Sequence, residues 1–185
     1  MSDTVSPWTT LSTRLVYENP WIRVREDRVL NPAGGEGIYG LVRFRNRAVG
    51  IIPVDEAGHT WLVGQYRYAL DHYSWEIPMG GQPLDQDPLE GARRELREET
   101  GLRAGRFDSL LEVDLSNSVT DERGCVYLAR DLVEGPPEFE DTEAIRIRRL
   151  PLEEALAMAL DGRIRDLLSV TGLMALGLRR EEFGL

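Results

Sequence analysis

The chain has 185 residues, of which 42% are hydrophobic, enough for one domain of ordinary size with a core of its own. A formal net charge of −10 argues against a protein that binds nucleic acid or anionic membranes, because proteins that bind such polyanions carry an excess of basic residues. The single cysteine, Cys125, excludes an internal disulfide, and no signal peptide or membrane-spanning apolar run is evident, so we expect a cytoplasmic protein.

The first part of the chain predicts a small antiparallel sheet. Residues 21–25 alternate between apolar and charged side chains, residues 31–35 have turn composition, and residues 38–44 form a second candidate strand. A sheet of two or three strands is marginal alone and needs a partner surface. We therefore expect residues 1–45 to form an N-terminal β segment and residues 46–185 to form the main domain.

The main domain is predicted to belong to the α+β class. An apolar run at residues 48–54 is typical of a buried strand, and residues 60–66 follow as a second strand. Later strands are expected at 107–115, 125–132 and 144–150, and helices at 152–160 and 166–178. Helices set among mixed strands indicate an α/β/α sandwich around a mixed sheet.

The helix predicted between its N-cap, Asp87, and its left-handed stop, Gly101, carries three carboxylates on one side. At 100° per residue, the side chains of Glu95, Glu98 and Glu99 project within an arc of about 100°. Carboxylates so close repel one another unless a cation compensates their charge. Surroundings rich in oxygen and without nitrogen ligands favour Mg²⁺, with Mn²⁺ as a possible substitute, over zinc.

The segment 80–102 resembles the Nudix box, whose fixed positions are matched in register by Gly80, Arg94-Glu95-Leu96, Glu98-Glu99 and Gly101-Leu102. The resemblance implies a loop, helix and loop in which Glu95, Glu98 and Glu99 hold divalent metal, with Glu99 also serving catalysis. It implies that the main-chain carbonyl of Gly80 completes the ligand set.

Gln86 is the one departure from the family pattern, which has a glutamate at this position. In the family that glutamate pairs with the arginine matching Arg94 and braces the loop against the helix. A glutamine can accept a hydrogen bond from a guanidinium but loses the charge-assisted part, worth about 1 kcal/mol. We expect a looser brace, with the metal ligands intact.

Two flanking segments, Gln65-Tyr66-Arg67 and 75–80, resemble the lead-in of ADP-ribose pyrophosphatases and related nucleoside-diphosphate-sugar hydrolases. We expect Arg67 either to contact substrate phosphate and help shape the pocket or to form a structural ion pair. The resemblance extends to Glu122, before a later strand, and to Trp21, which would stack on adenine. It also implies a homodimer in which the N-terminal strands contribute to the partner's substrate pocket.

The general base is expected in the acidic run that ends at Glu143, a loop position from which this subgroup often supplies its base. Glu140 is the alternative within the loop, and Glu122 a more distant one. The two histidines, His59 and His72, lie in segments with no evident route to the site.

A pyrophosphate linkage resists water because negative oxygens shield its phosphorus atoms, so hydrolysis needs charge neutralisation, an oriented water and a stabilised leaving group. We therefore expect magnesium-dependent hydrolysis of a nucleoside diphosphate derivative, with ADP-ribose, yielding AMP and ribose 5-phosphate, as the preferred substrate. GDP-mannose, a dinucleoside polyphosphate or coenzyme A are alternatives. A hypothesis of another class is a Nudix domain that senses a nucleotide without hydrolysing it.

Overall fold

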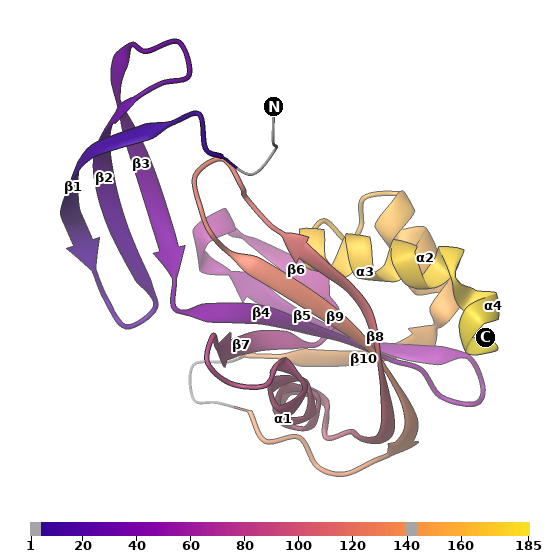
Figure 1. The fold of residues 1–185 in the computed structure, drawn as a ribbon. Coiled ribbons are helices and arrows are strands. Elements are labelled where there is room, and N and C mark those ends of the chain that lie inside the picture. The colour runs from indigo at the N-terminus through magenta and orange to yellow at the C-terminus, as the bar shows by residue number, and fades with distance from the viewer. Residues whose placement is uncertain (1–4, 140–143) are drawn as a thin grey trace. The chain divides into compact units, whose positions relative to one another are not determined.

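The computed structural model describes residues 5–139 and 144–185, which divide into two compact units (Figure 1). The N-terminal unit combines the chain up to Asn46 with the distant segment Asp114–Glu122. The main unit consists of Arg47–Val113 and Arg123–Leu185.

The N-terminal unit is a three-stranded antiparallel sheet in the order β1 (Thr9–Glu18), β2 (Ile22–Leu30) and β3 (Glu36–Phe44). The predicted antiparallel sheet is therefore confirmed, with β1 as a strand that the sequence pattern did not predict. Segment 114–122 attaches to β3, because the Tyr39 hydroxyl donates to the carbonyl of Ser118 (2.6 Å) and the N–H of Val42 donates to the carbonyl of Val119 (2.8 Å).

The main unit contains two sheets with the strand orders β7-β4-β9-β8 and β10-β5-β6. Their strands are β4 (Asn46–Pro53), β5 (His59–Arg67), β6 (His72–Glu76), β7 (Met79–Pro83), β8 (Arg103–Asp114), β9 (Arg123–Val133) and β10 (Arg146–Pro151). β4 pairs with β9 in parallel, whereas β5 pairs with both of its neighbours in antiparallel fashion. The predicted mixture of strand directions is confirmed.

Helices cover both faces of these strands (Figure 1). The helical elements are α1 (Pro88–Thr100), α2 (Leu152–Leu160), α3 (Leu167–Leu178), α4 (Arg180–Phe183) and the 3₁₀ turn η1 (Tyr68–Leu70). Adjacent strand residues point to opposite faces. Accordingly, Ile51 packs in one core with Ala92 and Leu96 of α1, and Ile52 packs in another with residues of α2 and α3. The α/β/α sandwich is confirmed. Within the described ranges, no helix is long and apolar enough to cross a membrane.

Candidate active site

The helix that carries the three glutamates begins and ends where the sequence predicts. The Asp87 side chain accepts a hydrogen bond from the N–H of Leu89 (2.9 Å), and Pro88 occupies the first turn. At the other end Gly101 has φ 75°, and its N–H donates to the carbonyl of Arg97 (2.8 Å). A glycine adopts this left-handed conformation without steric cost. Both ends of α1 are thereby fixed.

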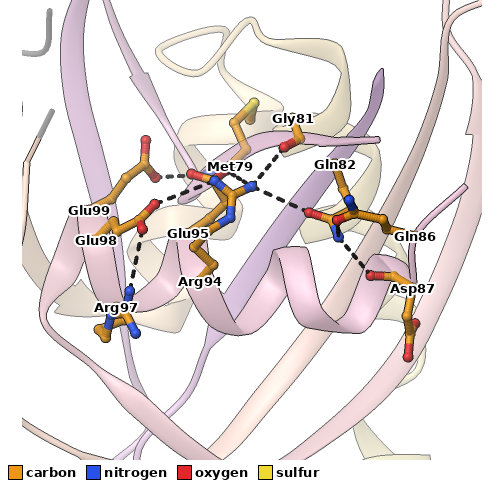
Figure 2. Close-up of polar contacts among 10 residues, drawn as sticks. All are labelled: Met79, Gly81, Gln82, Gln86, Asp87, Arg94, Glu95, Arg97, Glu98 and Glu99. Carbon is orange, nitrogen blue, oxygen red and sulfur yellow. Dashed lines mark hydrogen bonds and ion pairs between the residues drawn. The ribbon is translucent and has the colours of Figure 1, made fainter. Parts of the chain in front are cut away.

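Two of the three glutamates are withdrawn from solvent. Glu95 is 7% exposed and Glu99 1% exposed, and the side chain of Glu98 is 19% exposed. The Glu99 carboxylate accepts a 2.8 Å hydrogen bond from the N–H of Met79, at the start of β7 (Figure 2). We call Glu95, Glu98 and Glu99 the carboxylate face of α1. Its innermost member is anchored to the main chain of a strand.

Gly80 lies directly against this face. A Cβ atom at this position would overlap the carboxylate of Glu95, so any residue larger than glycine would displace that side chain. Gly80 and Glu95, the residues that carry two of the predicted metal ligands, therefore lie side by side. Carboxylate and carbonyl oxygens are ligands that suit a hard divalent cation.

A guanidinium compensates the charge of the carboxylate face. Arg94 Nη2 lies 2.7 Å from Glu95 Oε1, and its Nη1 lies 3.5 Å from Glu98 Oε2. Within residues 5–139 and 144–185, no three acidic, histidine or cysteine side chains converge closely enough to grip an ion in this arrangement. The oxygen donors fit a divalent metal, but Arg94 would have to move away from Glu95 and Glu98 for a metal to bind there. Metal ligation by the three glutamates stays a prediction.

Gln86 reaches Arg94 only through a third residue. Arg94 Nη2 donates to the carbonyl of Gly81 (2.7 Å) and to Gln82 Oε1 (3.4 Å), while Gln82 Nε2 donates to Gln86 Oε1 (3.1 Å) (Figure 2). The expected brace between Gln86 and Arg94 is thus relayed by Gln82, which is 4% exposed. The sequence offered no signal for Gln82, because it matches no fixed position of the box.

Arg67 forms a bidentate ion pair with Glu76, which is only 2% exposed. Its Nε lies 2.9 and 3.1 Å from the two carboxylate oxygens, and its Nη2 also contacts Glu76. Hydrogen bonding to Glu76 raises the pKa of Arg67, burial opposes the rise, and the negative charges of Glu76, Asp166 and Glu99 add to it. The structural ion pair considered for Arg67 is present. Sequence reasoning missed Glu76 as a site residue, although Glu76 lies in the flanking segment 75–80.

A pocket of about 560 Å³ lies beside this ion pair. Its walls come from the turn that joins β5 to β6 and from Arg165 and Asp166, at the start of α3. Arg67 and Glu76 both line this pocket, so the ion pair also helps to shape it.

The other predicted site residues belong to other parts of the chain. Trp21, which is 69% exposed, and Glu122 belong to the N-terminal unit. Glu143 and Glu140 lie outside the described residues. The roles expected for these four residues stay predictions.

Comparison with known proteins agrees with this architecture. The family model "NUDIX domain" matches residues 44–169, and "Nucleoside diphosphate sugar hydrolase N-terminal domain" matches residues 8–42. An ADP-ribose pyrophosphatase of Mycobacterium tuberculosis is 33% identical over 169 residues, covering 90% of this chain and 81% of the relative. A CMP-5'-(N-acetyl-N-hydroxy-3-aminopropyl)phosphonate hydrolase of Streptomyces rubellomurinus is 33% identical over 182 residues, covering 96% and 87%.

A crystal structure of an ADP compounds hydrolase superposes with a TM-score of 0.86, covering 99% of both chains at 21% identity, which shows a shared fold. With the family match spanning most of the chain, this protein belongs to the Nudix hydrolase family.

Proposed function

We propose that this protein hydrolyses the pyrophosphate bond of a nucleoside diphosphate derivative in the presence of Mg²⁺, or of Mn²⁺ as a substitute. ADP-ribose is the best candidate substrate, and its products would be AMP and ribose 5-phosphate. The observation that carries the proposal is the carboxylate face of α1, with Glu95 against Gly80 and Glu99 bonded to Met79.

Each residue of the site has a distinct part in this proposal. A divalent ion held by the carboxylate face would neutralise phosphate charge and lower the pKa of a bound water. The main-chain N–H of Met79 holds the Glu99 carboxylate in one orientation, because a buried carboxylate keeps the hydrogen-bond donor that it has. Glu143 is the proposed general base. Arg67, already held by Glu76, would present its remaining donors to substrate phosphate from the wall of the adjacent pocket.

The N-terminal unit supports a proposed homodimer. Every residue of β1 is exposed, and large apolar side chains remain in contact with solvent, among them Leu15 (54% exposed), Trp21 (69%) and Ile38 (71%). A three-stranded sheet with uncovered apolar side chains needs a partner surface. We infer that residues 1–45 form a segment that pairs with a second copy of the chain and brings Trp21 to its substrate. Light scattering should then give the mass of a dimer, whereas a monomer would contradict this part of the proposal.

The two relatives support a nucleotide-linked substrate, but they differ in the nucleobase of that nucleotide. One is named for ADP-ribose and the other for a phosphonate joined to CMP. A pyrimidine nucleotide derivative is therefore a second candidate, which joins GDP-mannose, dinucleoside polyphosphates and coenzyme A in the set of compounds to test.

The test is a substrate panel in ¹⁸O-labelled water. Purified protein with MgCl₂ is expected to release AMP and ribose 5-phosphate from ADP-ribose, with ¹⁸O in one product, which identifies the attacked phosphorus. Release from another member of the panel at a higher kcat/KM would replace ADP-ribose as the substrate. Absence of any phosphomonoester product would overturn the enzymatic proposal, and tight nucleotide binding without turnover would favour the sensing alternative.

A further inference from the structure

The guanidinium of Arg94 forms ion pairs with the carboxylate face of its own helix. In the described part of the chain, the carboxylates that it contacts are Glu95, at 2.7 Å, and Glu98, at 3.5 Å. Its other acceptors, the carbonyl of Gly81 and the amide oxygen of Gln82, are neutral. The positive charge of Arg94 is therefore balanced by the groups that would hold a metal ion.

These contacts are partly shielded from water. The side chains of Arg94, Glu95 and Glu98 are 37%, 10% and 19% exposed. Ion pairs at such sites are screened less than pairs on an open surface. A divalent cation that approaches Glu95 must displace the guanidinium or bind beside a like charge, and both raise the free energy of the loaded state.

The position of Arg94 depends on what lies on its other side. The side-chain amide of Gln82 bonds to three neighbours, with Oε1 accepting from Arg94 and Nε2 donating to Gln86 and to the carbonyl of Asp87. Gln86 is exposed, and its oxygen points to this amide (Figure 2). A neutral residue at position 86 gives the guanidinium no charged alternative to Glu95 and Glu98.

We propose that Arg94 is an internal counter-ion of the carboxylate face, and that neutral Gln86 keeps it there, so that a higher metal concentration is needed to load the site. The inference rests on the proposed function, because it requires a metal at this face. A carboxylate at position 86 would offer Arg94 a charged acceptor and draw the guanidinium away from Glu95.

The test measures Mn²⁺ binding to the substrate-free protein by electron paramagnetic resonance, so that catalysis is not involved. Four proteins form a cycle: wild type, Gln86→Glu, Arg94→Gln and the double variant. Each single variant is expected to lower the Kd for Mn²⁺ by about 3- to 10-fold, the range of a partly exposed ion pair. In the Arg94→Gln background, Gln86→Glu should add little, because the group through which it acts is gone.

An added negative charge could strengthen metal binding by itself, so a matched control is needed. Leu84→Glu adds the same charge to the same exposed loop, at a residue with 55% exposure. A gain from Leu84→Glu equal to that from Gln86→Glu would overturn the inference, as would an unchanged Kd in Gln86→Glu. Both results leave the proposed function standing if wild type binds Mn²⁺ and hydrolyses its substrate. Absence of Mn²⁺ binding in all variants, together with absence of hydrolysis, would overturn both.

Discussion

The main-chain N–H of Ile77 donates a 3.0 Å hydrogen bond to the hydroxyl of Ser169, which lies 92 residues further along the chain. Ser169 is fully buried, and its hydroxyl in turn donates to Asp166 (2.8 Å). The same carboxylate accepts the N–H of Ser169 and so caps α3. The start of α3 is thereby joined to the segment that follows β6.

The two residues after Ile77 extend this connection across the sheet. The carbonyl of Pro78 accepts the N–H of Ile51 in β4 (2.8 Å), and the N–H of Met79 donates to Glu99 in α1 (2.8 Å). Three consecutive residues are thus bonded to a helix on one face, to a strand, and to a helix on the other face. This segment therefore connects the Glu99 carboxylate to a hydroxyl in the opposite layer of the sandwich.

Ser169→Ala is expected to lower both stability and turnover. It leaves the buried N–H of Ile77 without an acceptor, which costs about 1–3 kcal/mol of unfolding free energy. If the segment then shifts, Glu99 loses its orientation, and kcat should fall roughly 10-fold with little change in KM. Urea denaturation and steady-state kinetics measure the two effects.

The matched control is Thr171→Ala on the same helix. The Thr171 hydroxyl bonds to the carbonyl of Leu167 (2.7 Å), within α3 itself, so its removal should leave kcat unchanged. A Ser169→Ala protein that is less stable but has the kcat of wild type would restrict Ser169 to a structural role.

Glu98→Gln and Glu99→Gln should each abolish most hydrolysis while the fold persists. A glutamine keeps the size of the side chain, and at position 99 its amide oxygen can still accept the N–H of Met79. The lost charge weakens the hold on a divalent cation, so activity should fall roughly 100-fold or more. Product release at saturating Mg²⁺ and thermal unfolding followed by circular dichroism test this. Turnover equal to that of wild type would refute the assignment of these residues as metal ligands.

Local signals explain why α1 could be predicted from the sequence. Asp87 and Gly101 determine where the helix begins and ends, and helical geometry alone places Glu95, Glu98 and Glu99 on one side. These features depend on near neighbours, which a sequence displays directly.

Features that depend on distant segments could not be predicted in this way. No spacing in the sequence links Ser169 to Ile77, because their contact requires α3 to pack against the strands. β6 and β7 have five residues each, and Pro78 lies between them, so neither shows a measurable alternation. The substitution at Gln86 indicated a weaker brace, but only the structure places Gln82 between Gln86 and Arg94.

Acid should weaken the turn between β4 and β5 through Asp55. Burial raises the pKa of Asp55, but hydrogen bonds from the N–H groups of His59 and Ala57 and from the Arg149 guanidinium outweigh it, so the net pKa lies below the ordinary 3.8. A carboxyl group with a depressed pKa contributes stability above its unfolded pKa and loses it as the pH falls through the folded value.

Asp55→Asn should therefore destabilise the protein at pH 7 by about 1 kcal/mol and by progressively less as the pH falls below 3.8. Urea denaturation of both proteins at several pH values between neutral and acid gives the difference in unfolding free energy. A difference that stays constant over this range would show that the charge of Asp55 does not stabilise the turn.

Glu143→Gln should slow the chemical step and leave the Kd for Mn²⁺ close to that of wild type, because we propose Glu143 as a base and not as a ligand. Loss of a general base typically lowers the rate by about 10²- to 10⁴-fold. Glu140→Gln is the matched control within the same acidic run, and it should retain most activity. Single-turnover kinetics with ADP-ribose separate the chemical step from substrate binding. If Glu140→Gln is the slower of the two, the base is Glu140, and if both retain the wild-type rate, Glu122 becomes the candidate to replace next.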